Sequence, residues 1–230
     1  KKRTTPLLNS PFLDEIADRQ IFIKAECLQH TGSFKFRGAY SAISSIPIEK
    51  RKKGVIAYSS GNHAQGVAFA AKIHKIPATI IMPEDAPEIK INNTKDLGAE
   101  VILYDRLSEN REKIGQKISE ERLLSLIPPY DHNDVIAGQG TIGLEIASQA
   151  EQIGIGKADV LVCCGGGGLT SGIAVALSTL MPDFVTRPVE PEGFDDVVRS
   201  LKTGERQTNK KISGGLCDAI ITPTPGDLTF

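Results

Sequence analysis

The chain has 230 residues, of which 40% are hydrophobic and 24% are charged, and its formal net charge is −1. This composition is typical of a globular protein that buries its core in one large domain or two small ones. The balanced charge gives no electrostatic reason to expect binding to nucleic acid or to an anionic membrane surface. No hydrophobic stretch approaches the roughly 20 residues of a membrane-spanning helix, and the first residues, KKRTTPLLNSPFLDE, lack a signal-peptide core.

The cysteine pattern indicates in which cellular compartment the protein folds. Cys163 and Cys164 are adjacent, and the sequence has no CxxC pair and no cluster of histidines near a cysteine. This pattern argues against a zinc site or a disulfide scaffold, so we expect a cytoplasmic protein.

Short hydrophobic runs alternate along the chain with longer amphipathic stretches. The runs predict strands at residues 21–25, 55–58, 78–82, 101–104, 124–127, 160–163 and 185–190. The stretches predict helices at 34–45, 63–74, 87–97, 108–122, 142–153, 169–180 and 195–201. Such alternation is typical of an α/β fold built from parallel β-α-β units with helices on both faces. Two polar stretches, 50–53 and 204–211, are expected to be solvent-exposed loops.

One strand runs directly into four glycines and then into a helix, in the segment CCGGGGLTSG at 163–172. Because glycine has no Cβ, successive amides can converge on an anion, and the helix N-terminus adds its positive dipole. A tight turn rarely needs more than one glycine, so four favour a phosphate site. The segment has no Gly-Lys-Ser/Thr, which excludes a P-loop for ATP or GTP. The near match of Gly166, Gly168 and Ser171 to GxGxxG, with Glu190 at a later strand end, leaves a dinucleotide-binding fold open.

A second turn of small residues, YSSGNHAQG at 58–66, also joins a strand to a helix. Its amides, together with Ser59, Ser60, Asn62 and His63, suit a carboxylate as well as a phosphate. The alternative is an ordinary helix cap, although a cap uses only one of these side chains.

A third segment, HTGSFKFRGA at 30–39, places Lys35 in a first helical turn after Ser33 as the expected N-cap. The helix dipole and the flanking Phe34 and Phe36 favour the neutral amine, which is the form that makes a Schiff base. The alternative is an exposed lysine beside two core phenylalanines.

These three features together suit pyridoxal 5′-phosphate holding an amino acid. The chain also resembles the serine/threonine dehydratase and serine racemase family of fold-type II pyridoxal-phosphate enzymes over essentially its whole length. The resemblance is carried, in this order, by GSFKFRGA, SSGNHAQGVA, IIMPEDAP, AGQGTIGLEI, CCGGGGLTSGIA, VEPEGFDD and PTPGDLTF. It implies a tryptophan synthase β-like fold with two lobes, each a mostly parallel twisted sheet flanked by helices. Residues 1–50 and 133–230 would form the large cofactor-binding domain, and 51–132 a small mobile domain.

The resemblance also implies roles for individual residues. Lys35 would carry the cofactor as a Schiff base and move the α-proton, and Phe34 would pack on the cofactor ring. Asn62 would bond the 3′ oxygen of the ring, and Gly215 would let the ring lie against the backbone. The phosphate would be held by the amides of Gly165, Gly166, Gly167, Gly168 and Leu169.

The substrate carboxylate would be held by the loop Ser59, Ser60, Gly61, Asn62 and His63. Ser60 matches the serine that faces the Schiff-base lysine and serves as second acid/base in racemases of the family. Arg111 of the small lobe is a further candidate to reach the active site, whereas His74 and His132 are expected to be structural or surface residues.

An acidic loop precedes the last predicted helix. The carboxylates of Glu190 and Asp196, with a backbone carbonyl between them, suit Mg²⁺, Ca²⁺ or Mn²⁺. A solvated loop that caps the helix at Asp195 is the alternative. The resemblance places Glu190, the carbonyl of Phe194 and Asp196 on a divalent-cation site.

The function that the resemblance implies is a dehydratase (ammonia-lyase) that converts threonine, serine or a similar β-hydroxy amino acid to the 2-oxo acid and ammonia. A serine racemase with side dehydratase activity and a 3-hydroxyaspartate dehydratase are alternatives, and a nucleotide-binding regulatory or dehydrogenase domain is a rival from another class. We expect a homodimer that acts on a small amino acid. Because the family continues past PTPGDLTF to the group that faces the pyridine nitrogen, we expect the C-terminal part of the large lobe to lie outside these residues.

Overall fold

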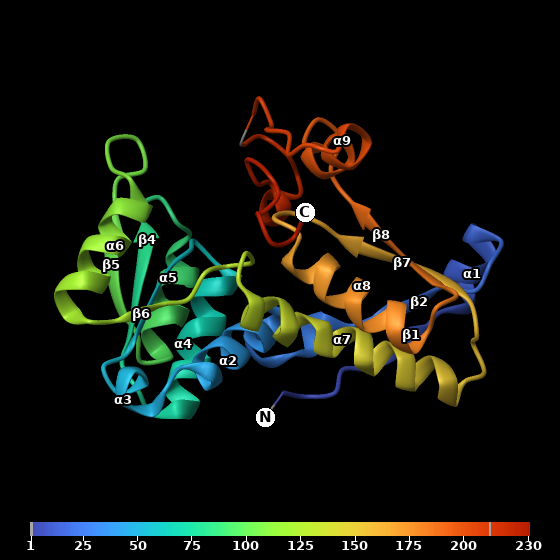
Figure 1. Cartoon of the computed structure of the whole chain (residues 1–230), viewed down its shortest axis with the longest axis horizontal. Coiled ribbons are helices and arrows are strands. Elements are labelled where there is room, and N and C mark those ends of the chain that lie inside the picture. The colour runs from blue at the N-terminus through green and yellow to red at the C-terminus, as the bar shows by residue number, and fades with distance from the viewer. Residues whose placement is uncertain (1, 212) are drawn as a thin grey trace.

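The fold is described from a computed structural model, for residues 2–211 and 213–230. Two parallel sheets lie at opposite ends of the molecule and are joined by the helices α2 (Lys35–Ser45) and α7 (Asn133–Gln152) (Figure 1). The first sheet has the strand order β5-β4-β3-β6, from β3 (Val55–Tyr58), β4 (Ala78–Pro83), β5 (Glu100–Tyr104) and β6 (Ser125–Leu126). The second pairs β7 (Ala158–Cys163) with β8 (Phe184–Val189).

Helical crossovers connect the parallel strands, as the alternating pattern predicts. The crossovers are α4 (Asn62–His74), α5 (Glu88–Asp96), α6 (Arg111–Arg122) and α8 (Gly168–Leu180). The helix α9 (Asp196–Thr203) follows β8. The α/β prediction is therefore confirmed.

Three features differ from the prediction. The strands β1 (Leu7–Asn9) and β2 (Phe22–Lys24) pair antiparallel around α1 (Pro11–Ala17), where the sequence predicts only one strand. The expected loop at 50–53 is partly helical, because α3 (Ile48–Arg51) ends within it. Short elements such as these carry too few residues for a periodic pattern to develop.

The third difference is the start of α7, which lies at Asn133 rather than at residue 142. Its first half is rich in glycine, which disfavours a helix in isolation. In the fold these glycines allow close helix contacts: a Cβ on Gly138 would lie 2.6 Å from the Arg37 carbonyl oxygen, and one on Gly140 would lie 2.9 Å from that of Gly172. Tertiary packing therefore outweighs the low helix propensity of this stretch.

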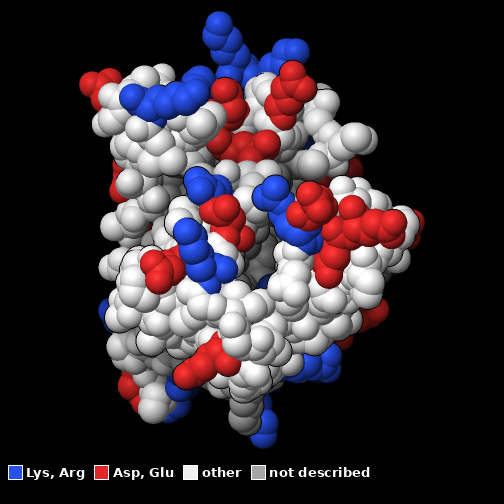
Figure 2. All heavy atoms as spheres, turned by 90° about the vertical axis from the view of Figure 1, so that its right-hand side faces the viewer, with Lys and Arg blue, Asp and Glu red and all other residues white. Residues whose placement is uncertain are grey.

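Two hydrophobic clusters form most of the core. One surrounds the four-stranded sheet and includes Phe36, Ala39 and Ile43 of α2, so α2 packs against the 51–132 region. The other lies between α7, α8, β7 and β8, with the half-buried Phe34 and Leu169 packed against it. Among the described residues, no helix is long and apolar enough to cross a membrane. On the face that Figure 2 shows, acidic and basic side chains are interspersed.

A buried ionic network fixes α2 against α7. The Arg37 side chain is 0% exposed, and its guanidinium donates to both Glu145 oxygens, at 2.8 and 3.0 Å, and to both Glu26 oxygens, at 2.8 and 2.7 Å. Lys24 donates to the same Glu145 carboxylate at 2.8 Å. Burial alone would raise the pKa of Glu145, but the hydrogen bonds from its cationic neighbours outweigh burial and hold it far below the ordinary value.

Removing this carboxylate is expected to destabilise the protein. Glu145→Ala leaves buried cations undercompensated, so we expect the free energy of unfolding to fall by about 3 kcal/mol in urea titrations. Glu151→Ala, at an exposed position on the same helix, is the control and should change little. Folding lowers the pKa of Glu145. The contribution of its carboxylate to the free energy of unfolding is therefore complete above the ordinary pKa of 4.5, and it is lost as the pH falls below that value. The difference between wild type and variant should shrink accordingly in acid, and equal stabilities at neutral pH would contradict the prediction.

Candidate active site

The segment that leads from β6 to α7 contacts all three predicted motifs. We call residues 127–131 the strap; it runs between the two sheets (Figure 1). The Ile127 carbonyl accepts from His63, the Pro129 carbonyl accepts from Lys35, and the Tyr130 ring packs on Gly166. Lys35, the serine-rich turn and the glycine loop are therefore brought together around one short segment.

Lys35 is the first residue of α2. Its Nζ donates to the Pro129 carbonyl oxygen at 2.8 Å and lies 5.3 Å from the centre of the Phe34 ring. Burial lowers the pKa of the amine to about 8 from its ordinary 10.5. Among the residues that the structure describes, no carboxylate forms an ion pair with Lys35. The amine therefore deprotonates more readily than an ordinary lysine.

The expected N-cap for this helix is wrong. Phe34, not Ser33, occupies the cap position, and Ser33 is buried with no hydrogen-bond partner for its Oγ among the described residues. The start of α2 is held instead by close contact with α4, since a Cβ on Gly66 would lie 3.1 Å from the Lys35 carbonyl carbon. Packing, rather than a side-chain cap, sets where this helix begins.

His63 is the second residue of α4, at the end of the serine-rich turn, and its side chain is buried. Its Nε2 is 2.9 Å from the Ile127 carbonyl oxygen; because a carbonyl only accepts, Nε2 carries the hydrogen. Burial, and then the charge of Lys35, lower its pKa to about 3, so the ring is neutral near pH 7. His63 thus anchors the turn to the strap.

The remaining residues of the turn lie nearer the surface. The Ser59 Oγ accepts from the Gly61 amide at 3.2 Å, and Ser60 and Asn62 are exposed. Among the described residues, the amides of 62–64 at the start of α4 have no hydrogen-bond acceptor. The turn therefore presents free donors, as a carboxylate site requires.

The glycine loop lies between β7 and α8, as predicted. Within 2–211 and 213–230, nothing accepts a hydrogen bond from the amides of residues 165–169. A Cβ on Gly166 would lie 2.3 Å from the Tyr130 ring, and one on Gly167 would lie 2.7 Å from the Thr229 Oγ1. Gly167 also has a φ of +92°, which disfavours other residues. The glycines thus admit these side chains on one side while the amides remain free to bind an anion.

The C-terminal residues help to hold this loop. Thr229 Oγ1 donates to the Gly166 carbonyl at 2.6 Å, and the Asp131 carboxylate accepts from the Leu228 amide at 2.8 Å. Gly215 packs beside Phe194 and Ile221, whose side chains would lie 3.2 and 3.1 Å from a Cβ there. The segment that follows it reaches the loop, because the Ile220 carbonyl oxygen would lie 3.2 Å from a Cβ on Gly165.

The predicted cation ligands are held by hydrogen bonds to α9 and to the segment that follows it. The Glu190 carboxylate accepts from the amides of Val197 and Val198, both at 2.8 Å, and Asp196 accepts from Asn209 at 2.6 Å. Burial is the main cause that raises the pKa of both carboxyls. Among the described residues, no three His, Cys, Asp or Glu side chains are grouped to hold a metal. The predicted site has two carboxylates, and its third ligand, the Phe194 carbonyl, is a backbone group.

Tyr130 is a site residue that the sequence patterns do not reveal, because it lies in none of the motifs described above. Burial, and then Asp131, raise the pKa of its hydroxyl, while the neighbouring Arg111 partly lowers it. Arg111 itself stacks on Tyr58 at the end of β3, 5.4 Å from the ring centre. Of the two histidines expected to be structural, His74 stacks on Tyr40 and His132 caps α7.

Comparison with known proteins identifies the family. Residues 1–230 match the family model described as "Pyridoxal-phosphate dependent enzyme". The chain belongs to the pyridoxal-phosphate dependent enzymes. The family prediction is thereby confirmed, and it decides against the dinucleotide-binding alternative.

Relatives and solved structures of such pyridoxal-phosphate enzymes are similar over most of the chain. The L-threo-3-hydroxyaspartate ammonia-lyase of a Pseudomonas species is 50% identical over 87% of this chain and 61% of its own length. The serine racemase of Schizosaccharomyces pombe is 47% identical over 98% of this chain and 68% of its own length. The structure of maize serine racemase superposes with a TM-score of 0.92, at 36% identity, over 99% of this chain and 68% of that one. This confirms the fold-type II prediction, and it shows that the chain spans only part of these proteins.

The residues present suit the cofactor of this enzyme family. The buried amine of Lys35 has a lowered pKa and pairs with a neutral carbonyl, and the glycine loop presents unpartnered amides at the start of α8, counting the described residues as possible partners. An aldehyde requires the first feature and a phosphate requires the second. When bound, pyridoxal phosphate supplies an electron sink for the carbon next to the substrate amine.

The lowered pKa of Lys35 predicts the pH dependence of cofactor attachment. Only the neutral amine attacks an aldehyde, so the initial rate of attachment should rise with pH to half its maximum near pH 8. Absorbance after addition of pyridoxal phosphate to the cofactor-free protein measures this rate, and Lys35→Ala should abolish it. A half-maximum near the ordinary 10.5 would contradict the predicted effect of burial.

Proposed function

We propose that this chain belongs to a pyridoxal-phosphate dependent ammonia-lyase that dehydrates β-hydroxy amino acids. The observation that carries the proposal is the Lys35 amine, whose pKa is lowered and which, among the described residues, is paired only with the backbone carbonyl of Pro129 in the strap. The next residue of the strap, Tyr130, packs on Gly166 of the glycine loop, whose amides are free among the described residues. Relatives named ammonia-lyase support the reaction class. We infer that the protein is cytoplasmic and forms a homodimer.

Each residue has a defined task in this proposal. Neutral Lys35 removes the proton from the substrate α-carbon as general base, and the pKa of about 8 leaves a useful neutral fraction near pH 7. The backbone of the glycine loop would bind the phosphate, Phe34 would pack on the cofactor ring, and Gly215 would let the ring lie against the backbone. Asn62 binds the 3′ oxygen. The substrate carboxylate is held by Ser59, Ser60, Gly61, Asn62 and the turn's anchor, His63.

The substrates in question differ at the side chain. Serine and threonine carry a neutral one, whereas 3-hydroxyaspartate adds a second carboxylate. Arg111 stacks on Tyr58, directly before the loop 59–63 that is proposed to hold the substrate carboxylate. Its charge also partly offsets the rise that burial causes in the pKa of the Tyr130 hydroxyl in the strap. A guanidinium in this place favours 3-hydroxyaspartate, on which relatives 50% and 49% identical are named as acting.

Racemisation is the second candidate, supported by a relative 47% identical that is named serine racemase. It needs an acid on the face opposite Lys35, and the exposed Ser60 is the residue proposed for it. Elimination needs no such second acid.

A combined experiment tests both reactions. The loaded protein should show a visible absorption band. Borohydride should bleach this band and fix the cofactor covalently on Lys35. Lys35→Ala should lose the band and all formation of 2-oxo acid. Ser60→Ala should abolish interconversion of L- and D-serine while elimination from one enantiomer continues. Absence of a trappable band in the wild type would refute the proposal. Loss of elimination together with interconversion would remove Ser60 from its assigned role.

We also propose that residues 51–132 are a small lobe that moves against a cofactor domain formed by 1–50 and 133–230. The strap and the segment before β3 are the covalent crossings between these parts. Closure of this lobe would exclude water from the reacting atoms. In this proposal α2, whose Phe36 packs in the hydrophobic cluster around the four-stranded sheet, would form the contact between the small lobe and the cofactor domain.

A divalent cation, Mg²⁺, Ca²⁺ or Mn²⁺, is proposed between Glu190, the Phe194 carbonyl and Asp196. Two neighbouring carboxylates whose pKa values are raised gain most from a cation, and the buried Asp196 Oδ2 has no hydrogen-bond partner among the described residues.

Calcium or magnesium at about 100 times its Kd should then raise the melting temperature by roughly 5 to 10 °C. A chelator should reverse the shift, and Asp196→Asn should remove it. Glu192→Gln, at an exposed position in the same loop, should keep it. If neither the cation nor the chelator changes the melting temperature of the wild type, the cation site is excluded.

A further inference from the structure

A lysine on α5 reaches the proposed carboxylate loop. The side chain of Lys90 lies across Gly61: its Nζ, Cδ and Cε are 3.4, 3.6 and 3.7 Å from the position that a Cβ on Gly61 would take. Gly61 is buried, so Lys90 forms part of its cover. No predicted motif includes Lys90, and the fold alone brings it to this loop.

The charge of Lys90 is not compensated by a neighbouring carboxylate in the part of the chain that the structure describes. Lys90 is half-buried, and among the described residues no carboxylate forms an ion pair with it. The other charged residues of α5, Glu88, Lys95 and Asp96, are exposed. An ammonium beside this loop without a counter-charge attracts an anion, so an anionic ligand at the loop would compensate it.

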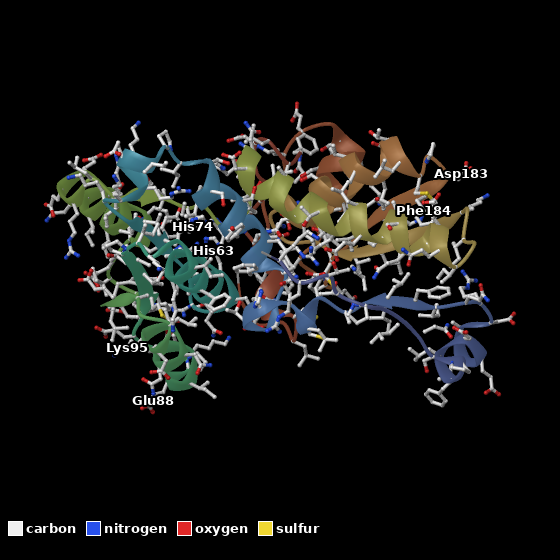
Figure 3. All side chains as sticks on the ribbon, turned by 90° about the horizontal axis from the view of Figure 1, so that it is seen from below. His63, His74, Glu88, Lys95, Asp183 and Phe184 are labelled. Atoms are coloured by element: carbon white, nitrogen blue, oxygen red, sulfur yellow. The ribbon has the colours of Figure 1, made fainter. Side chains whose placement is uncertain are left out.

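The packing of α5 explains why Lys90 and not its neighbours reaches the loop. Thr94, one turn further along the helix, is fully buried and donates to the Lys90 carbonyl at 2.8 Å. Ile91 packs against the core. Lys90 therefore stands at the inner side of α5, whereas Lys95 and Glu88 lie at the periphery, apart from His63 (Figure 3).

We propose that Lys90 is a binding residue for the α-carboxylate of the amino-acid substrate, held against the loop that contains Gly61. The inference rests on the proposed function of that loop. It assigns Lys90 to the carboxylate that all these substrates share, and Arg111 to the second carboxylate of 3-hydroxyaspartate alone. Replacing Lys90 should then raise KM by a similar factor for every substrate.

Kinetics of the loaded enzyme test this assignment. Lys90→Gln should raise KM for serine, threonine and 3-hydroxyaspartate by about tenfold each, the loss expected for a charge-assisted hydrogen bond, with a smaller effect on kcat. Lys90→Arg should restore much of the affinity, and Lys95→Gln, on the same helix, should behave as wild type. The melting temperatures of the variants check that the fold is retained.

Binding of propionate provides a readout that needs no turnover. Propionate carries a carboxylate but no amine, so it cannot react with the cofactor. Its Kd, measured by saturation-transfer NMR, should rise in Lys90→Gln by about the factor seen in KM.

Three results would overturn the inference: an unchanged propionate Kd in Lys90→Gln, a KM change confined to 3-hydroxyaspartate, or an equal effect of Lys95→Gln. Failure of the proposed function has a different signature, since the wild type would then form no 2-oxo acid and show no borohydride-trapped band. The propionate titration decides the role of Lys90 in that case as well.

Discussion

The hydrogen bond from Lys35 to the Pro129 carbonyl is the contact on which the rest of the site depends. A carboxylate at 2.8 Å would stabilise the ammonium and raise the pKa of the amine, whereas a neutral carbonyl leaves burial as the dominant cause and lowers it to about 8. The geometry needs two fixed partners, the start of α2 and the strap. The ion pairs of Arg37 fix the first, and the hydrogen bonds of His63 and Asp131 fix the second.

The start of α2 is fixed by ionic contacts and by close backbone approach. Arg37, two residues after Lys35, is fully buried between Glu26 and Glu145, so rotation or sliding of the helix would separate buried charges. Gly66 on one side and Gly138 on the other allow α4 and α7 to approach the α2 backbone closely. The strap is fixed from its own ends, through His63 bonded to Ile127 and through Asp131 bonded to the amides of 227 and 228.

Local sequence signals predict only those parts of the fold that depend on neighbouring residues. The strand at 55–58 and the glycine loop were predictable, because a hydrophobic run and a cluster of glycines are local features. The beginning of α7 was not, since its glycines lower the local helix propensity and are explained only by the helices that pack against them. The cap of α2 was wrong for a similar reason, as Ser33 has the right chemistry but is buried in packing. Tyr130 and Lys90 reach the site from segments without a motif, so only the fold places them there.

The polarity of the groups that meet at the strap limits what they can bind. Within the described residues, the groups at this site are donors: the unpartnered amides of residues 62–64 and 165–169, the ammonium of Lys90, and Lys35, which is bound to a neutral carbonyl. Arg111 is paired with Glu112 at 3.0 Å. The buried His63 stays neutral because its own burial and the charge of Lys35 both oppose a second proton. Glu145, the carboxylate bound by Arg37, is occupied by its cationic partners and leaves the donors of the site uncompensated. Such an arrangement favours ligands with two separate anionic groups, which is the charge distribution of a phosphorylated cofactor joined to an amino acid.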